Sequence, residues 1–277
     1  MSRDLPPWLV PRYRKYGALK RMAPTLRRCQ VATICEAARC PNVGECFGAG
    51  TATFLILGEV CTRKCTYCAV GHGVPQPPDS AEPARVAAAA RELGLNYVVI
   101  TSVTRDDLAD GGAGQFAATV RALREALPLA RVETLVPDFA GDEAALAQVV
   151  RARPDVLGHN VETVPRLYPE VRPGADYQRS LALLRAVARA GLRTKSGAML
   201  GLGEELDEVR EVMHDLAAAG VGILTLGQYL QPTRKHRPVA RYVEPQEFAA
   251  LEREASAVGF GEVKAGPFVR SSYRAGD

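Results

Sequence analysis

The hydrophobic pattern of this chain alternates between helical periods and short apolar runs. Apolar residues recur every three or four positions in residues 177–188 and again in residues 206–216, which is the spacing of a helix with one buried face. Glycine supplies the left-handed conformation that commonly ends a helix. Four glycines stand just before apolar runs that are typical of β-strands, namely Gly94, Gly191, Gly220 and Gly259.

The apolar runs predict the strands of the fold. They cover residues 53–57, 96–101, 131–135, 155–159, 193–196, 222–226 and 262–265, and a last helix is predicted at 245–258. Strands that alternate with helices of this length favour a parallel sheet with helical crossovers. About six β/α units fit between residues 53 and 226, whereas a complete eight-unit barrel needs about 250 residues. We therefore predict an α/β fold with a partial, open (β/α)6 TIM-like barrel. A doubly wound sheet is the alternative, although no G-x-G-x-x-G follows the first strand.

Three segments of the chain differ in pattern. Residues 1–50 show little regular periodicity and hold four of the seven cysteines, so we expect an N-terminal extension that folds across the barrel. Residues 51–230 carry the alternating strands and helices of the barrel itself. Residues 231–277 are expected to form a short C-terminal extension, which ends in the segment R-S-S-Y.

Composition excludes several classes of protein. Hydrophobic residues make up 47% of the 277 residues and charged residues 24%, which is typical of a globular protein and not of a disordered, collagenous or coiled-coil chain. The first residues contain an acid and two prolines where a signal peptide has an apolar run. The uncharged stretch 216–233 contains glycines and a proline, so we interpret it as helix end, strand and loop. We expect a cytoplasmic protein with no membrane span.

The net charge of +4 is unevenly distributed. Residues 1–30 contain eight Lys and Arg against one Asp, and a second basic group consists of Arg234, Lys235, Arg237 and Arg241. Each group is either an ordinary solvated surface or a docking face for an acidic partner. Aromatic residues make up only 6% of the chain and no recognition motif accompanies the basic residues, so nucleic-acid binding is not expected.

All seven cysteines lie between Cys29 and Cys68. Thiolates this close in sequence favour a shared metal centre, because short loops let several sulfurs converge. A structural zinc site normally uses paired C-x2–4-C hooks, and disulfides do not suit an odd cysteine count in a reducing compartment. Iron–sulfur clusters are therefore expected, and Cys29 is left as a spare thiol. The two triplets are Cys35, Cys40 and Cys46, and Cys61, Cys65 and Cys68.

The second triplet reads C-x3-C-x2-C directly after the first predicted strand, and this resembles the radical S-adenosylmethionine (SAM) superfamily. The upstream C-x4-C-x5-C narrows the resemblance to the lipoyl synthase family. Thr104 departs from that family, which often has Asp at this position. Further similar segments are V-I-T-S-V-T-R-D-D-L-A-D-G-G-A (99–113), E-T-L-V-P-D-F (133–139), H-N-V-E-T-V (159–164), V-R-P-G-A-D-Y (171–177), K-S-G-A-M-L-G-L-G-E (195–204), L-T-L-G-Q-Y-L-Q-P (224–232) and G-P-F-V-R-S-S-Y (266–273).

The resemblance implies a barrel of the radical SAM type and a radical-mediated sulfurtransferase. Its reaction inserts two sulfur atoms at carbons 6 and 8 of a protein-bound octanoyl-lysine, giving the lipoyl group. The implied cofactors are SAM and two 4Fe-4S clusters. Cys61, Cys65 and Cys68 would hold one cluster, whose open iron binds SAM. The upstream triplet would hold an auxiliary cluster that is consumed as the sulfur donor, with Ser272 as its fourth ligand and Ser271 as the alternative.

Five further residues are expected near SAM by resemblance. Tyr67 stands before the last cysteine, where the superfamily has an aromatic residue that packs near the adenosyl group. The other four are Ser102, Asn160, Lys195 and Glu204. Each also has an ordinary structural interpretation, such as a half-buried tyrosine, a turn cap, a solvated lysine or the start of a helix.

The same resemblance implies partners. The substrate would be an octanoylated lipoyl carrier domain, as in 2-oxoacid dehydrogenase E2 subunits or the glycine cleavage H protein, and reduced ferredoxin or flavodoxin would supply electrons. Such carriers are generally acidic, so the basic groups of this chain would steer them. Two alternatives remain. One is another radical SAM enzyme with an auxiliary cluster, such as biotin synthase or a methylthiotransferase, and the other is a non-catalytic electron carrier.

Overall fold

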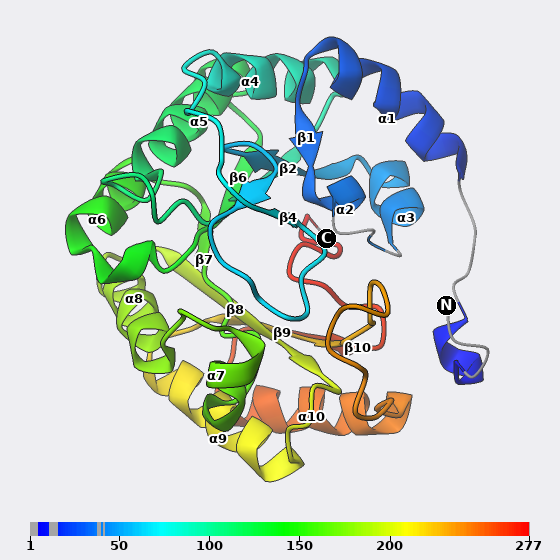
Figure 1. Ribbon diagram of the computed structural model, residues 1–277. Helices are drawn as coiled ribbons and strands as arrows, with labels where there is room; N and C mark the ends of the chain where they lie inside the picture. The colour runs from blue at the N-terminus through cyan, green and yellow to red at the C-terminus, as the bar shows by residue number, and fades with distance from the viewer. Residues whose placement is uncertain (1–4, 11–15, 38–39, 41, 277) are drawn as a thin grey trace. The chain divides into compact units, whose positions relative to one another are not determined.

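The computed structural model describes residues 5–10, 16–37, 40 and 42–276, apart from the side chains of residues 16–21 and 43. The described residues fall into two compact units, both drawn in Figure 1. The division into three consecutive segments stays a prediction. The β2 unit lies within Tyr13–Arg63, Val70–Leu157 and Ser272–Asp277, and the β8 unit lies within Met1–Arg12, Lys64–Ala69 and Gly158–Ser271.

The β2 unit is built on a mostly parallel sheet. All six residues of its strand β2 are buried, which is typical of a parallel strand that is covered on both faces. β1 pairs antiparallel with β2, whereas β2, β5 and β6 run parallel. The strands follow in the order β1 (Ala32–Thr33), β2 (Thr51–Ile56), β5 (Tyr97–Ser102), β6 (Arg131–Leu135) and β7 (Val156–Gly158). The helices α4 (Glu82–Glu92), α5 (Ala113–Ala126) and α6 (Glu143–Arg151) lie along one side of this sheet (Figure 1).

The loops after β2, β5 and β6 leave the sheet at the carboxyl ends of its strands, which is where parallel barrels place their sites. The loop after β2 contains a small parallel sheet of β3 (Val60–Cys61) and β4 (Gly71–His72). The loop after β6 contains the 3-10 turn η2 (Phe139–Gly141). Cys61, Ser102 and Asp138 therefore stand at or beyond this end of the sheet.

The N-terminal segment is more regular than its sequence pattern predicts. It forms α1 (Tyr16–Arg28), α2 (Ile34–Ala37) and α3 (Val43–Gly48), and β1 adds an antiparallel edge to β2. Among the described side chains of α1, only Met22, Thr25 and Leu26 are buried. The apolar positions of α1 do repeat with a helical period, but Pro24 lies inside the helix, and a proline within such a pattern normally argues against a continuous helix.

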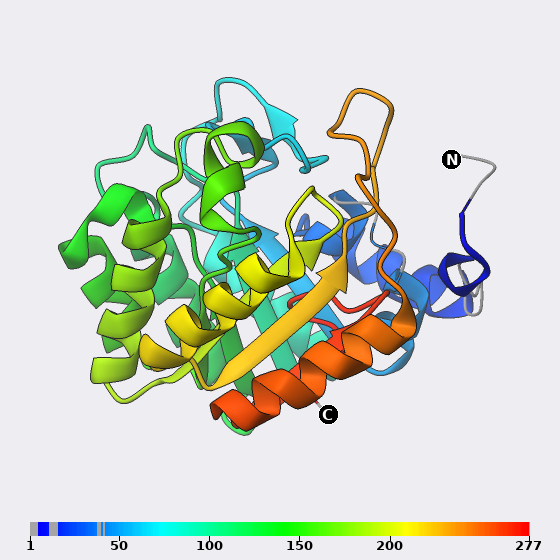
Figure 2. The same ribbon diagram turned by 90° about the horizontal axis from the view of Figure 1, so that it is seen from below.

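The β8 unit is also an α/β layer. Its strands β8 (Arg193–Leu200), β9 (Ile223–Gln228) and β10 (Glu262–Gly266) are parallel, and Lys195 and Glu262 both lie opposite Ile223. The helices α8 (Tyr177–Arg189), α9 (Leu206–Ala218) and α10 (Pro245–Val258) pack along these strands, and Figure 2 shows α9 and α10 on either side of β9. The unit also holds the short elements η1 (Pro7–Leu9), η3 (Pro165–Leu167) and α7 (Tyr168–Val171). Buried side chains of these helices and strands form its core, including Leu184, Met213, Leu216, Leu224 and Phe248.

The predicted alternation of strands and helices is confirmed. The predicted helix 245–258 has the observed bounds, because Glu244 and Glu247 form a capping box at its start and Gly259 ends it with a left-handed φ of 116°. β8 runs four residues beyond its prediction, through the segment G-A-M-L. The stretch 216–233 is helix end, strand and loop as predicted, and no helix in the described part of the chain is long and apolar enough to cross a membrane.

Close packing at Gly227 generates a prediction. A Cβ atom there would lie 2.0 Å from the carbonyl oxygen of Val269, whereas a Cβ at Gly222 would meet nothing closer than 3.9 Å. Gly227→Ala should therefore displace the segment that leads into R-S-S-Y and lower the free energy of unfolding by about 1–3 kcal/mol. Gly222→Ala is the matched control, and denaturant unfolding of the two variants measures the difference. Equal stability of both variants would contradict this account of the contact.

Candidate active site

The cysteines of C-x3-C-x2-C are held by backbone contacts in both units. In the β2 unit, Cys61 ends β3, and the backbone N–H of Arg63 donates to its Sγ over 3.4 Å. In the β8 unit, the N–H of Cys68 donates to the carbonyl oxygen of Cys65 over 3.1 Å, which makes a tight turn. All three cysteines are half-buried, as a cluster that must meet a substrate requires.

Two other segments of the β8 unit hold the turn from Cys65 to Cys68. The N–H of Thr66 donates to the carbonyl oxygen of Val171 at the end of α7 (3.0 Å). The carbonyl oxygen of Thr66 accepts from the N–H of Arg237 (2.9 Å). His236 Nε2 lies 2.9 Å from the carbonyl oxygen of Cys68, and its Nδ1 lies 2.8 Å from Thr233 Oγ1. Since a carbonyl oxygen can only accept, Nε2 of His236 carries a proton. His236 therefore supports the cysteine turn, a role that sequence reasoning missed.

A polar cluster surrounds Tyr67 in the β8 unit. Burial raises the pKa of Tyr67 well above its ordinary value, and the charge of Glu162 adds to this shift while Arg172 opposes it. Tyr67 is therefore a neutral phenol. Burial also raises the pKa of Glu162, against the effect of Arg172 and of a hydrogen bond from Asn160 Nδ2 (3.0 Å). Glu162 has a left-handed φ of 66°, a strained conformation of the kind that collects at functional sites.

Arg172 is the second residue that sequence reasoning missed. Its Nη1 donates to the carbonyl oxygens of Asn160 and Val161, both at 3.0 Å, and to Tyr168 Oη at 3.1 Å. Its Nε is buried and has no hydrogen-bond partner among the described residues. The motif V-R-P-G-A-D-Y was the available signal. A buried, unsatisfied guanidinium donor beside Tyr67 is chemically suited to an anionic group such as a carboxylate.

The structure places the remaining predicted SAM residues at different points. Ser102 ends β5, and its buried Oγ has no partner among the described residues, so it is available to a ligand. Lys195 lies on β8 and is 4% exposed, which rules out the solvated reading. The carboxylate of Glu204 is buried and accepts from the backbone N–H groups of Gly201 (2.5 Å) and Leu202 (2.9 Å), so it fixes a turn.

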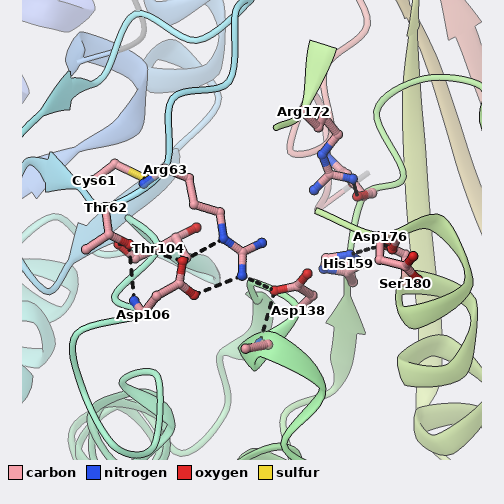
Figure 3. Close-up of polar contacts among 12 residues, drawn as sticks. Cys61, Thr62, Arg63, Thr104, Asp106, Asp138, His159, Arg172, Asp176 and Ser180 are labelled. Atoms are coloured by element: carbon pink, nitrogen blue, oxygen red, sulfur yellow. Dashed lines mark hydrogen bonds and ion pairs between the residues drawn. The ribbon is translucent and has the colours of Figure 1, made fainter. Parts of the chain in front are cut away.

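His159 is a satisfied core histidine. It is 2% exposed, and its Nε2 lies 3.0 Å from Ser180 Oγ, which in turn donates to the carbonyl oxygen of Asp176 (Figure 3). The histidine therefore supports the loop after β7 and has no predicted role in the reaction.

The upstream cysteines lie close together in the β2 unit. Burial raises the pKa of Cys35 to about 12, and the neighbouring charges of Cys40 and Cys46 add to the shift while Thr53 opposes it. Burial and Cys40 raise the pKa of Cys46 to about 11. The charge of Cys40 thus acts on both Cys35 and Cys46. Thiolates there are unfavourable without a cation, and iron in a cluster supplies that positive charge, so the donor set fits the expected cofactor.

The two serines of R-S-S-Y have different neighbours. Ser272 Oγ accepts from Thr53 Oγ1 over 2.8 Å, and Thr53 also hydrogen-bonds Cys35. Ser271 Oγ instead donates to Asn160 Oδ1 over 3.3 Å in the β8 unit. Tyr273 Oη donates to Glu45 Oε1 over 3.0 Å, next to Cys46 in sequence. The end of the chain is thereby tied to the site of the upstream cysteines.

No group of three or more His, Cys, Asp or Glu in the described part of the chain is arranged to hold a single metal ion. A single ion needs all its ligands around one point. A cubane cluster differs, because each of its three cysteines binds a different iron and the sulfurs stand further apart.

Comparisons with known proteins show which family this chain resembles. A family model of the radical SAM superfamily matches residues 55–216. The lipoyl synthase of Thiobacillus denitrificans is 55% identical over 274 residues, which cover 98% of this chain and 88% of that protein. The lipoyl synthase of Trichlorobacter lovleyi is 56% identical over 273 residues, which cover 98% and 96%. Among solved structures, methylornithine synthase (PylB) aligns with a TM-score of 0.58 at 13% identity over 90% of this chain and 82% of that chain.

The fold and the cysteine motif thus define a radical SAM enzyme with a partial α/β barrel, which confirms the predicted fold class. The identity to curated relatives over almost the whole chain narrows this further. The chain belongs to the lipoyl synthase family. Radical SAM enzymes of this family use SAM and two 4Fe-4S clusters, as the sequence motifs predict.

The contact of His236 with the cysteine turn can be tested. His236→Ala removes two hydrogen bonds, each worth about 0.5–1.5 kcal/mol. We expect a chelator to remove iron from the C-x3-C-x2-C cluster about tenfold faster, since about 1.4 kcal/mol corresponds to a factor of ten. His214→Ala is the control, because His214 is exposed on α9. The decay of cluster absorbance gives both rates, and equal rates would remove the assigned role.

Proposed function

We propose that this chain inserts two sulfur atoms at carbons 6 and 8 of an octanoyl group carried on a lysine of a lipoyl carrier domain. The observation that carries the proposal is the 55–56% identity to lipoyl synthases over 98% of the chain. The two cysteine triplets and R-S-S-Y in the sequence support it. No side-chain base can remove a proton from such a methylene, because nothing stabilises the carbanion. The reaction therefore depends on bound cofactors.

Cys61, Cys65 and Cys68 would hold the first 4Fe-4S cluster, with one iron left open for SAM. When bound, the reduced cluster and SAM together supply the homolytic removal of hydrogen from an unactivated carbon. The task of the chain is to hold and orient these groups. The turn at Cys65–Cys68, supported by His236 and Thr66, keeps two of the three ligands in place.

SAM would be bound by polar groups that the fold leaves unsatisfied. The buried Nε of Arg172 is available to the SAM carboxylate, and Ser102 Oγ offers a second free polar atom. Tyr67, as a neutral aromatic ring, would pack near the adenosyl group. Asn160 and Lys195 would contribute from the loop after β7 and from β8. Glu204 would act indirectly: its carboxylate accepts from the N–H of Gly201 and so would fix the turn beside SAM.

Cys35, Cys40, Cys46 and Ser272 would hold the auxiliary cluster that donates sulfur. The hydrogen bond from Thr53 supports Ser272 over Ser271, because Thr53 also contacts Cys35. A serine oxygen is a harder donor than a thiolate and a poorer match to iron–sulfur chemistry. An iron bound through Ser272 should leave more easily, which suits a cluster that is dismantled during turnover.

The partners would be octanoylated carriers, such as 2-oxoacid dehydrogenase E2 subunits and the glycine cleavage H protein, with reduced ferredoxin or flavodoxin as electron donor. In the second basic group, Arg237 pairs with Glu170 and Arg241 pairs with Glu247. Arg234 and Lys235 are exposed, and no ion pair joins them to any described residue. An acidic carrier would therefore be steered mainly by these two cations.

The first basic group lies largely outside the described residues. Of the basic side chains in residues 1–30, the structure describes only those of Arg27 and Arg28, and Arg28 pairs with Glu92. Its role in docking stays a prediction. A cytoplasmic location suits the whole proposal, because the cysteines must remain reduced to bind iron.

The function is tested by anaerobic turnover. The reconstituted protein is assayed for iron and sulfide, and an octanoylated carrier is then analysed by mass spectrometry after one turnover with SAM and a strong reductant. We expect a mass gain of two sulfur atoms less the hydrogens lost. SAM cleavage without this gain would point to another radical SAM reaction, and no SAM cleavage would point to an electron carrier.

The serine assignment has a matched pair of variants. Ser272→Ala should weaken the auxiliary cluster and abolish sulfur insertion while the first cluster still cleaves SAM. Ser271→Ala should leave the iron of the auxiliary cluster in place, because Ser271 contacts Asn160. Iron and sulfide content, together with Mössbauer spectra, separate the outcomes. A loss of auxiliary iron in Ser271→Ala alone would reverse the assignment.

The docking surface has a charge-reversal test. Arg234→Glu with Lys235→Glu should slow turnover of an acidic carrier domain and flatten its salt dependence, because steering depends on charge. Turnover of a short octanoyl-lysine peptide should change little. If both substrates slow equally, the two residues act inside the site and not as a docking surface.

A further inference from the structure

The loop that carries Cys61 is bound along its length to the loop after β5. The N–H of Thr62 donates to the carbonyl oxygen of Thr104 over 3.1 Å, and Thr62 Oγ1 donates to the same oxygen over 3.0 Å. The N–H of Asp106 donates back to Thr62 Oγ1 over 3.1 Å. Figure 3 shows these contacts beside Cys61. The segment V-T-R-D-D is therefore a support for the cysteine loop.

Arg63, the next residue, continues this support with its side chain. Its guanidinium binds both carboxylate oxygens of Asp106, with Nε and Nη2 each at 2.8 Å (Figure 3). Nη2 also pairs with Asp138 Oδ1 at 2.6 Å. The side chain of Arg63 is 9% exposed and that of Asp138 only 1%. One guanidinium thus joins the cysteine loop to the loops after two neighbouring strands.

The turn that presents Asp138 is strained. Phe139 and Ala140 follow it with left-handed φ angles of 46° and 50°, and neither is a glycine. Asp138 accepts from the N–H of Ala140 over 3.2 Å and so stabilises the turn. Such strain persists where the surrounding structure requires it. Here it points a buried carboxylate at Arg63.

Arg63, Asp106 and Asp138 form an ion-pair group in which one guanidinium faces two carboxylates. An arginine guanidinium keeps its positive charge at any physiological pH, and that of Arg63 donates to Asp106 and pairs with Asp138. A buried pair is strongly destabilised when one partner is removed, because the other charge is left uncompensated. The three side chains are therefore held rigidly, and the charge of Arg63 lies two residues along the chain from Cys61.

We propose that Arg63 is a positioning residue for the first cluster: with Asp106 and Asp138 it fixes the loop of Cys61 and sets the charge that the cluster senses. This inference rests on the proposed ligand role of Cys61, Cys65 and Cys68. It assigns a role to the motifs R-D-D-L and V-P-D-F, which the proposed function does not use. Thr62 and Arg63 transmit the position of the loop after β5, and hence of Ser102, to the cysteine loop.

The experiment compares two neighbouring aspartates. Asp106 binds Arg63, whereas Asp107 binds Arg105 in the same two-pronged way, and both carboxylates are 37% exposed. Asp106→Asn should speed the removal of iron from the first cluster by about tenfold, because it removes the charge of a carboxylate that accepts two hydrogen bonds from Arg63. Asp107→Asn should leave that rate unchanged. Cluster absorbance during chelation measures both, in full-length protein that also carries Cys35→Ala, Cys40→Ala and Cys46→Ala.

The reduction potential of the cluster distinguishes this role from mere stabilisation of the fold. Arg63→Gln removes a positive charge and should lower the potential, whereas Asp138→Asn removes a negative charge and should raise it. If the substitutions only loosened the structure, the reduction potential would shift in the same direction in both variants. Arg63→Lys keeps the positive charge but cannot make the two-pronged contact with Asp106. The reduction potential should therefore stay near that of the parent protein, while iron is lost as fast as in Asp106→Asn.

The outcomes separate this inference from the proposed function. If Cys61→Ala, Cys65→Ala and Cys68→Ala together leave the iron content unchanged, the ligand assignment itself fails. If that variant loses one cluster but Asp106→Asn and Asp107→Asn lose iron equally fast, the positioning role of Arg63 is wrong. Shifts of the potential in the same direction for Arg63→Gln and Asp138→Asn would overturn the electrostatic part.

Discussion

The main physical constraint on this structure is the cost of burying negatively charged thiolates. A buried thiol resists ionisation, as the pKa of about 12 at Cys35 shows, and a second thiol nearby makes the charge still less favourable. Iron reverses this penalty, because a cluster brings positive charge to the point where sulfurs converge. In the β2 unit, Cys35 lies on α2 and Cys46 on α3, beside strand β2. The same packing that buries these thiols therefore makes their ionisation depend on a bound cation.

The two parts of the C-x3-C-x2-C motif are positioned in different ways. The loop of Cys61 is held by Thr62 and Arg63, through hydrogen bonds and a buried ion-pair group. The turn at Cys65–Cys68 is held by backbone contacts and by His236. Ligands on short loops have little shape of their own, so neighbouring segments must supply it. The motifs around the cysteines thus serve geometry as much as chemistry.

The residues expected near SAM differ in how far the sequence alone indicates their surroundings. Ser102 was expected from its place at the end of a strand, and its unpartnered hydroxyl is consistent with a ligand contact. Glu204 was also expected near the cofactor, and its carboxylate accepts from the N–H groups of a turn, which the sequence did not indicate. Arg172 and His236 were not selected at all. Their importance comes from partners far along the chain, such as Cys68 for His236, and a single sequence carries no record of such pairs.

The sequence by itself determined the parallel α/β alternation, the two cysteine triplets and the family. These features are local, because helical period, strand propensity and ligand spacing each depend on residues that are close together in the sequence. Tertiary structure alone decided that Thr53 joins Ser272 to Cys35, and that Arg63 binds Asp106 and Asp138. Those contacts join residues separated by tens to hundreds of positions. The contacts of Arg63 exist because parallel strands bring the loops at their carboxyl ends together, and Thr53 meets Ser272 because the end of the chain returns to β2, which no local pattern encodes.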